Sequence, residues 1–424
     1  MITLGGTIGS GIFKGSSSSI GLAGPGVIFP YLIGGIILLV AMNSMAQMAV
    51  ANPKAKTLRD LLEPILGRFS GYFIGWIYWA NWVLVMAAEM AAASSFLQYW
   101  FPNAPLWILA LIMSIAMTAL NLLEVSVYGE TEYWLAGVKI TTLVLFIIFG
   151  AMLVFTHHPG KAVHNLIGYG GFFPHGASGL LSAMLVVMFS FGGVEMIGMA
   201  LGETIDPEHT VPRAVRGVIT RVLLFYILPI LIIVSLVPWN SLGFTQSPFV
   251  TVFSEIGVPY VGGIMNFVLL TAVLSAVNTG MYATSRMLYT QAVHGNAPKY
   301  FAGLSKKRVP TRALLFSTIF LYIGVIVAFF AKGHTFDYLM VFPGFAVIIV
   351  WSYLIIANMK SHGLTLFKLA SLLALCVILI GVVISTPAWG TAITIIVFSI
   401  VGVSYFVTSK QTPSDTLNES RESA

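Results

Sequence analysis

The sequence predicts an all-α polytopic membrane protein, and its composition and its apolar runs carry that prediction. Of the 424 residues, 58% are hydrophobic and only 8% are charged, whereas a soluble domain usually carries about 25% charged residues. The mean hydropathy is +0.92. Apolar runs of about 20 residues, the length that a helix needs to cross a bilayer, recur along the whole chain. We therefore expect a bundle of transmembrane helices with no inserted soluble domain.

The apolar runs define about twelve predicted transmembrane helices, with boundaries good to about four residues. Residues 1–408 then form a single transmembrane domain, and the polar residues 409–424 form a cytoplasmic tail that we expect to be disordered. The predicted spans are residues 1–22, 26–50, 70–99, 105–123, 129–155, 178–202, 212–236, 258–290, 311–331, 337–358, 364–385 and 388–408.

Basic residues lie almost entirely in the loops that follow even-numbered spans. Loops after odd-numbered spans contain only Lys161 and Lys332. By the positive-inside rule, the basic loops and both termini are cytoplasmic, which predicts a multi-pass protein of the cell membrane. The net charge of +6 is then a signal of topology and of contact with anionic membrane lipids, and we expect no nucleic acid partner. The residues on the predicted cytoplasmic side are Lys54, Lys56, Arg59, Arg68, Arg213, Arg216, Arg221, Lys299, Lys306, Lys307, Arg308, Arg312, Lys360 and Lys368.

The cysteine and histidine content predicts neither a metal ion nor another cofactor. The single cysteine, Cys376, lies in an apolar run, so the chain has no disulfide framework and no thiolate metal site. His157, His158, His164 and His175 crowd one predicted extracellular loop, but their spacing fits no standard zinc site. We therefore expect no metal-binding residues.

The stretch Gly5–Phe13 has four glycines in nine residues, although its surroundings are apolar enough for a membrane. Broken backbone at membrane depth is tolerated only where protein or a water-filled cavity covers it. Glycine at this density disfavours an unbroken helix and lets a ligand approach the backbone closely. The stretch therefore predicts a first span that is broken at mid-membrane, with free amide groups around Ser10 and Gly11.

A second glycine-rich stretch, Phe189–Glu195, lies in the sixth span, five spans after the first. Many transporters contain two inverted repeats whose substrate site lies between unwound helices at matching positions. Close helix packing through small residues is the alternative for either stretch taken alone. The match in position predicts repeats at about residues 1–155 and 178–358, with the extra helices at 364–408 outside them.

The chain resembles the amino acid–polyamine–organocation (APC) superfamily and, within it, the bacterial amino acid transporter (AAT) family of permeases. This resemblance implies the LeuT-type fold, a 5+5 inverted repeat of ten core helices with two extra C-terminal helices. The motifs that carry it are Gly6–Phe13, Ala23–Pro25, Gly75–Trp79 with Glu89, Gly129–Glu132 through Lys139, Phe189–Glu195 through Glu203, Leu274–Asn278 through Leu288, and Gly295–Pro298.

The chain departs from the pattern of that family at three places. Gln47 replaces a glutamate near the end of the second span, and Lys14 follows the glycine motif where an apolar residue is usual. Only Met1–Leu4 precede the motif, about 6 Å of helix at 1.5 Å per residue. We therefore expect an N-terminally truncated first helix, from a mis-assigned start or a truncated variant.

The two breaks suit an α-amino acid, because amides around Ser10 and Gly11 at the start of a half-helix favour a carboxylate. Carbonyls freed at Thr7 and around Phe189 and Gly192 can accept hydrogen bonds from the ammonium. The resemblance places substrate at the same positions. We expect side-chain selectivity from Phe191, Met196, span three and span eight, and no aspartate is placed to bind a cation. The predicted substrate-binding residues are Thr7, Ile8, Gly9, Ser10, Gly11, Phe189, Ser190, Phe191 and Gly192.

Four residues are candidates for proton coupling and gating. Lys139 lies eleven residues into the fifth span, where a charge is costly and is a functional candidate by default. The resemblance implies that a lysine here fills the place of sodium in sodium-coupled relatives and bridges span one to span eight, where Ser275 is its candidate partner. A snorkelling lysine or a static ion pair is the alternative. Glu195 and Glu89 also lie at membrane depth. Either acid can serve in proton coupling or gating, and structural pairing is the alternative.

Together these features predict secondary active transport by alternating access, as proton-coupled import (symport) of a neutral amino acid. The partners are then the amino acid, a proton and membrane lipids. An amino acid/amine exchanger (antiporter) and a cationic amino acid importer are the alternatives within the class, and a non-transporting sensor is the alternative outside it. The chain has no nucleophile–base constellation, so we predict no enzyme activity. The transported side chain, the coupling stoichiometry and the oligomeric state stay open.

Overall fold

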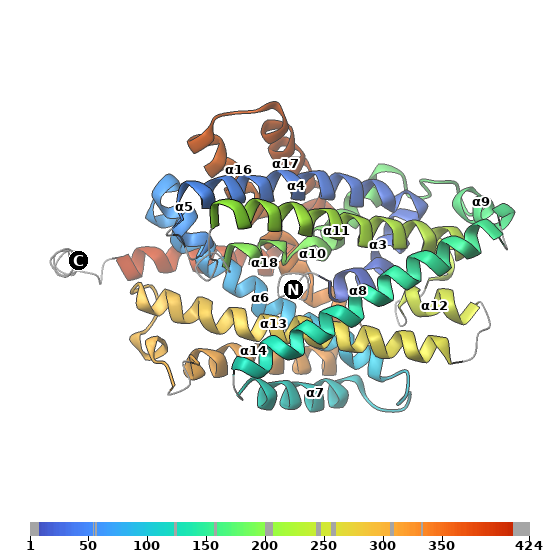
Figure 1. Ribbon diagram of the computed structural model, residues 1–424, viewed down its shortest axis with the longest axis horizontal. Helices are drawn as coiled ribbons and strands as arrows, with labels where there is room; N and C mark the ends of the chain where they lie inside the picture. The colour runs from blue at the N-terminus through green and yellow to red at the C-terminus, as the bar shows by residue number, and fades with distance from the viewer. Residues whose placement is uncertain are drawn as a thin grey trace.

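The structure is a computed structural model that describes residues 8–53, 55, 57–122, 125–156, 159–199, 207–242, 247–255, 260–305, 309–331 and 334–409. Within these residues the regular structure is helical and no strand occurs, which confirms the predicted all-α class. The predicted tail after Ser409 and the site residue Thr7 lie outside the described residues. Helices α4, α11 and α13 run nearly parallel along the longest axis of the molecule, and α8 crosses them obliquely (Figure 1).

The helices follow one another through short connections, which suits a chain of successive membrane spans. Their bounds in chain order are α2 Ser10–Phe13, α3 Gly15–Ala23, η1 Gly24–Val27, α4 Ile28–Ala51, α5 Leu58–Leu66, α6 Arg68–Leu97, α7 Leu106–Asn121, α8 Val125–Thr156, α9 Pro159–Ile167, α10 Gly176–Phe191, η2 Val194–Met199, α11 Pro207–Leu236, η4 Trp239–Ser241, α12 Pro248–Glu255, α13 Val261–Val293, η5 Lys299–Ala302, α14 Thr311–Phe330, α15 Thr335–Leu339, α16 Val341–His362, α17 Leu366–Ser385 and α18 Ala388–Ser409.

Ten helical segments of the described chain are long and apolar enough to cross a membrane. The difference from the twelve predicted spans has two causes. Predicted spans one and two join through the 3₁₀ turn η1 into one apolar segment, Gly15–Ala51. Predicted span four is α7, an apolar helix of only 16 residues. Every predicted span therefore contains a helix, and the chain is a polytopic membrane protein.

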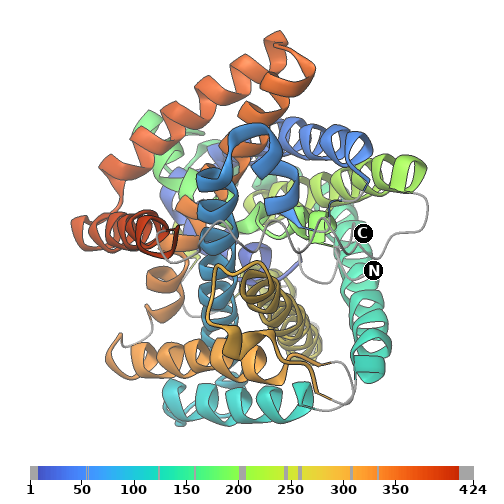
Figure 2. The same cartoon turned by 90° about the vertical axis from the view of Figure 1, so that its left-hand side faces the viewer.

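The short helix α10 lies at the centre of the bundle, in contact with α3, α4, α16 and α17. Its side chains from Ala183 to Phe191 are all buried. At the periphery, α17 and α18 expose apolar residues such as Ile384 and Ile400, and both helices lie on the outside of the bundle (Figure 2). A buried centre and an apolar outer surface are what a protein surrounded by lipid requires.

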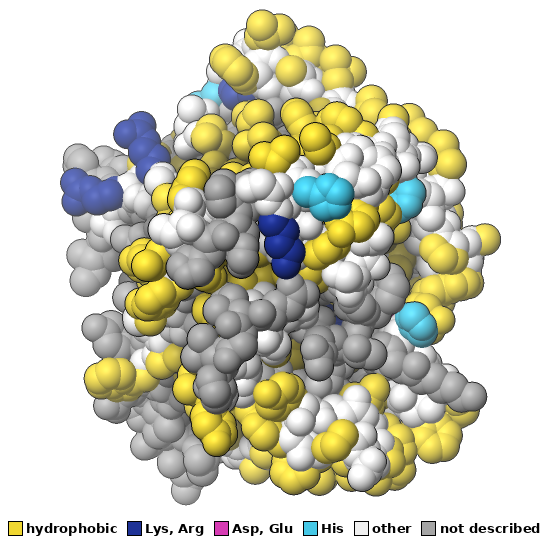
Figure 3. Space-filling view, turned by 90° about the vertical axis from the view of Figure 1, so that its right-hand side faces the viewer, with side chains coloured by type: hydrophobic (Ala, Val, Ile, Leu, Met, Phe, Trp, Pro, Cys, Tyr) yellow, Lys and Arg dark blue, Asp and Glu magenta, His cyan; other side chains and the backbone are white. Residues whose placement is uncertain are grey.

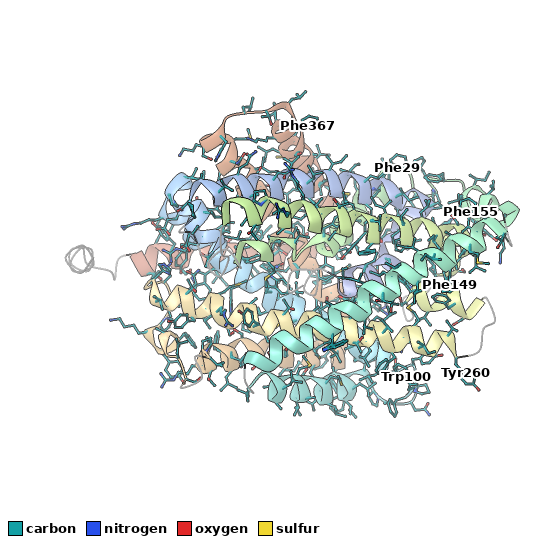
Figure 4. All side chains as sticks on the ribbon, in the orientation of Figure 1. Phe29, Trp100, Phe149, Phe155, Tyr260 and Phe367 are labelled. Atoms are coloured by element: carbon teal, nitrogen blue, oxygen red, sulfur yellow. The ribbon has the colours of Figure 1, made fainter. Side chains whose placement is uncertain are left out.

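Aromatic and aliphatic side chains also point outward from other helices. Phe149 and Phe155 project from α8 away from the bundle, and Phe367 projects from α17 (Figure 4). Seen from the end of the molecule that carries α9 and α12, hydrophobic side chains make up much of the rim (Figure 3). Exposed large hydrophobic residues on so many helices suit a surface that faces lipid.

Candidate functional site

The first candidate element is the start of the first span, where the helix begins at Ser10. Gly9 precedes it with an extended backbone, φ −131° and ψ −149°. The helix is interrupted again at Lys14, which separates α2 from α3. The carbonyl of Phe13 accepts a hydrogen bond from the hydroxyl of Ser247. The glycine stretch therefore places the beginning of a half-helix inside the bundle.

The second element is the break in the sixth span, between α10 and η2. Helix α10 ends at Phe191, and Gly193 takes a φ of +100°, a backbone conformation that favours glycine over other residues. The amide of Gly192 donates to the carbonyls of Met188 and Phe189 at 3.1 Å each. The carbonyl of Phe189, which we expected to be free for an ammonium, thus accepts a hydrogen bond within its own turn.

The two breaks touch each other directly. A Cβ atom added to Gly11 would lie 2.6 Å from the Cα of Ser190, so only glycine lets α2 approach α10 this closely. On the far side of α10, the carbonyl of Ser190 accepts a hydrogen bond from the hydroxyl of Tyr226 at 2.7 Å. Gly11 therefore has a packing role between the broken spans, in addition to any role toward a ligand.

A small cavity lies where the two breaks meet α6 and α16. Its volume is about 20 Å³, which is room for about one water molecule, so the site must widen to admit an amino acid. Of the predicted substrate residues, Gly9, Gly11, Phe189, Ser190 and Gly192 line it. The other lining residues are Asn81, Trp82, Val85, Glu89, Gly193, Pro343 and Val347.

Four predicted positions are not among the lining residues. Ser10 is bound by Glu89 instead. Ile8 is buried in the hydrophobic core, and Met196 is buried without lining the cavity. Phe191 packs against Tyr31 and Tyr226, with ring centroids 5.7 and 5.1 Å apart. The register of α10 turns Phe191 away from the cavity because the side chains at 189 and 190 face it. In this structure Phe191 is a packing residue, and its predicted contact with substrate stays a prediction.

The walls of the cavity come from α6 and α16 as well as from the two breaks. Span three contributes, as predicted, through Asn81, Trp82 and Val85 of α6. Helix α16 supplies Pro343 and Val347, and no residue of α13 is among the described lining residues, so the selectivity expected from span eight stays a prediction. Among these residues, Asn81 is 2% exposed and its Oδ1 atom accepts no hydrogen bond from any residue that the structure describes. No sequence motif singled out Asn81, and its position one helical turn after Tyr78 in an aromatic run gave no signal.

The side chain of Glu89, which belongs to α6, binds the first residue of α2. Both oxygens of its carboxylate accept the Ser10 amide at 3.0 Å, and Oε1 accepts the Ser10 hydroxyl at 2.8 Å. The side chain is 3% exposed. A Cβ atom on Gly9 would lie 2.5 Å from Oε1, so glycine at this position leaves room for the carboxylate. The Ser10 amide, which we predicted to be free, is therefore already paired with an acid of the same chain.

Lys139 and Ser275 are buried on α8 and α13, helices that pack on each other. Lys139 is close enough to Glu89 for the two charges to act on each other. Neither Lys139 nor Ser275 is without a partner. A bond between these two side chains stays a prediction.

Glu195 lies in η2 just after the second break and is 0% exposed. Its Oε2 atom accepts a long hydrogen bond of 3.5 Å from Trp351 Nε1, while its Oε1 atom has no hydrogen-bond partner in the described part of the chain. The phenol of Tyr78 is within electrostatic range. The backbone of Gly193 and of Glu195 itself also acts on this carboxylate. The second predicted acid is thus held mainly within its own turn, whereas the first is held by a residue of another helix.

On the side of the predicted extracellular loops, Phe189 packs edge-to-face on Phe336 of α15 at 5.7 Å. Lys14 is buried nearby and interacts electrostatically with Asp337. Asp337 also accepts a hydrogen bond from the Ser18 hydroxyl at 2.8 Å. The departure at Lys14 had signalled an unusual charge, but Asp337 lies 323 residues away and had no motif of its own.

Comparisons with known proteins agree with this architecture. A family model described as amino acid permease matches residues 1–420. A Bacillus subtilis protein named uncharacterized amino acid permease YvbW is 47% identical over 430 residues, which cover 97% of this chain and 96% of the relative. The gamma-aminobutyric acid permease of Bacillus subtilis is 40% identical, over 85% of this chain and 77% of the relative. The aromatic amino acid transport protein AroP of Escherichia coli strain K12 is 40% identical, over 85% and 79%.

Proposed function

Because the chain belongs to the amino acid permease family, we propose that it imports a neutral amino acid across the cell membrane together with a proton. Membership of the family makes the protein an amino acid transporter of the membrane and not an enzyme. The proton, the neutral side chain, the direction of transport and the cytoplasmic location of both termini are the parts that we propose.

The observation that carries the proposal is the carboxylate of Glu89 on Ser10. The amide and hydroxyl of Ser10 already hold one carboxylate at 2.8–3.0 Å inside the bundle. An α-amino acid brings a carboxylate of the same chemistry, and charge-assisted hydrogen bonds of this kind are the strong ones. The donors therefore suit the main-chain end of the substrate whatever its side chain.

The remaining walls of the cavity favour an uncharged side chain. Trp82, Val85, Phe189, Pro343 and Val347 present apolar surfaces, and Glu89 is the one charged residue among the lining residues. Since Glu89 is engaged by Ser10, a cationic side chain has no free counter-charge among these residues, and burying it unpaired is costly. These walls support a neutral substrate over the cationic alternative.

The buried ionisable residues support proton coupling. Lys139, Glu89 and Glu195 all lie at membrane depth and are at most 3% exposed, and such residues mark ion pathways and proton relays. We assign Lys139, with Ser275, to the link between the first span and α13, and Glu195 to gating at the second break. Alternating access then moves the predicted repeats, about residues 1–155 and 178–358, around the cavity.

The test is uptake by the purified protein in proteoliposomes with an imposed pH gradient. We expect accumulation of a labelled amino acid that stops when the gradient is collapsed, and competition by neutral amino acids in a panel of all twenty. Accumulation that requires sodium and ignores the proton gradient contradicts the coupling. Counterflow with no uptake into empty vesicles indicates an exchanger, the strongest competition by lysine or arginine indicates a cationic importer, and binding without flux indicates a sensor.

A further inference from the structure

We propose that Glu89 and the substrate carboxylate exchange on the same donors of Ser10, and that a proton on Glu89 accompanies each exchange. The proposal deepens the proposed function and rests on it, since it requires an amino acid substrate. It gives the coupling of proton and substrate a physical cause, namely one set of hydrogen-bond donors that two carboxylates cannot share.

The first step concerns the donors themselves. Ser10 has one amide hydrogen and one hydroxyl hydrogen, and both point at Glu89. A backbone amide is one donor and a serine hydroxyl is another, so a second carboxylate finds neither free. The cavity beside Glu89 holds only about 20 Å³. The substrate can therefore use Ser10 only after Glu89 has moved.

The second step concerns the other end of the substrate. Asn81 lines the same cavity, is 2% exposed, and has an Oδ1 atom with no hydrogen-bond donor among the described residues. A buried acceptor without a partner costs free energy, which an ammonium group entering the cavity relieves. The cavity is thus lined by Asn81, an acceptor for an ammonium, and by Glu89, the acid that occupies the donors of Ser10. Gly9 and Gly11, the chain neighbours of Ser10, line it too.

The third step concerns the charge on Glu89. A carboxylate that leaves Ser10 loses its hydrogen bonds while remaining buried, and an unpaired buried charge is strongly unfavourable. The titratable groups that act on Glu89 are Lys139 of α8 and Tyr226 of α11. Tyr226 uses its hydroxyl hydrogen on Ser190. Protonation removes the charge, so a neutral Glu89 leaves Ser10 at far lower cost.

The fourth step is the balance of one cycle. Glu89 takes a proton from the outer solution, and the carboxylate of the entering amino acid replaces it on Ser10, so a negative charge remains beside Lys139. When the amino acid leaves on the inner side, Glu89 gives its proton to the cytoplasm and returns to Ser10. One proton crosses with each amino acid. No covalent bond other than the O–H bond of Glu89 forms or breaks.

The experiment measures the dissociation constant of the best amino acid from the competition panel between pH 5.5 and pH 8, together with that of its α-carboxamide. Since binding and protonation are linked reciprocally, the affinity for the acid should weaken about tenfold per pH unit wherever Glu89 is ionised in the empty protein. The carboxamide has no carboxylate to place on Ser10, so its affinity should not vary in this way. This comparison uses the unaltered protein and so does not depend on a variant that folds.

Two variants show which acid takes up the proton. Glu89→Gln should bind the acid with an affinity that is flat with pH, while Glu195→Gln, the matched change in the other buried acid, should keep the dependence. Equal pH dependence for acid and carboxamide overturns the proposal, and so does a dependence that survives Glu89→Gln or is lost only in Glu195→Gln. If no amino acid binds or is taken up at all, the proposed function fails instead. If proton-driven uptake persists with an unchanged dependence in Glu89→Gln, only this inference fails.

Discussion

Glu89 and Glu195 are both buried acids associated with the two breaks, yet only Glu89 lines the cavity and their surroundings differ. Glu89 reaches the first break and receives three hydrogen-bond contacts at 2.8–3.0 Å from one residue, Ser10. Glu195 follows the second break and accepts a hydrogen bond of 3.5 Å from Trp351, and the backbone of Gly193 and of Glu195 itself also acts on its carboxylate. Its Oε1 atom is unpartnered among the described residues. The matching positions of the two breaks in the predicted repeats therefore do not imply the same task for the two acids.

The two acids therefore suit different roles: Glu89 exchanges with a ligand, and Glu195 responds to a rearrangement. The carboxylate on Ser10 is firmly placed, so it can exchange with a ligand of the same chemistry. Glu195 retains an unsatisfied buried oxygen, and a buried acceptor of this kind favours any rearrangement that brings it a donor. Tyr78 is already within electrostatic range, so a rearrangement of α6 against η2 can supply one.

The largest effect should come from Gly11→Ala, which removes the geometry on which the comparison depends. The added Cβ would lie 2.6 Å from the Cα of Ser190, and backbone atoms cannot move aside cheaply. Overpacking of this kind costs about 1–3 kcal/mol of stability, and we expect transport to be lost. Gly21→Ala is the matched control on the same span, because its Cβ would meet nothing within 4 Å. Equal uptake and equal melting temperatures in the two variants would refute the close contact.

Lys139→Ala should abolish proton-driven accumulation while leaving folding and surface expression largely intact. It removes the cation whose charge acts on Glu89, so the exchange on Ser10 loses its electrostatic balance. Uptake into proteoliposomes with a pH gradient checks this. Lys368→Ala is the matched control, since Lys368 is a buried lysine of the outer helix α17 that donates to the Gly363 carbonyl. Normal accumulation in Lys139→Ala contradicts the assignment.

Trp351→Phe tests the surroundings of Glu195, and we expect its effect on transport to be smaller. It removes the 3.5 Å donor to Glu195 Oε2 and shrinks a fully buried side chain, so we expect about 1–3 kcal/mol less stability. The pH dependence of substrate affinity should stay as in the unaltered protein, because Glu195 is not on Ser10. A thermal melt and the binding series together check this. Loss of the pH dependence in this variant would indicate that Glu195, and not Glu89, carries the proton.

Ser10→Ala should have the smallest effect on the affinity for substrate. The hydroxyl bond of 2.8 Å is lost both to Glu89 in the empty protein and to the substrate in the loaded one, so the two losses largely cancel. We expect the dissociation constant to change by less than about threefold, whereas a bond made to the substrate alone is worth about 1.5–3 kcal/mol. A loss of affinity of tenfold or more in a binding titration argues against the exchange.

The sequence predicted the helices and both breaks because these depend on local composition. Apolar runs marked every span, and the glycines at 9, 11 and 193 marked where helices begin or end. The partner of Ser10 depended instead on tertiary packing, because Glu89 lies 79 residues away on a different helix. The sequence identified Glu89 as too deep for solvent but not what it touches.

Side-chain direction was the other property that composition did not determine. Phe189 and Phe191 are both aromatic residues at the second break, yet only Phe189 faces the cavity, since residues two apart on a helix point to nearly opposite sides. Pro343 and Val347 of α16 line the wall, but an apolar pair four residues apart occurs in nearly every span. Asn81 was overlooked because one amide in an aromatic run resembles an ordinary packed polar residue.

The most direct test of the account is the number of protons that the purified protein takes up when it binds its amino acid. A pH-indicator dye in weak buffer measures this at a pH where Glu89 is ionised in the empty protein. The account predicts about one proton per bound amino acid and none for Glu89→Gln or for the α-carboxamide. Binding without proton uptake, or equal proton uptake by Glu89→Gln, would contradict it.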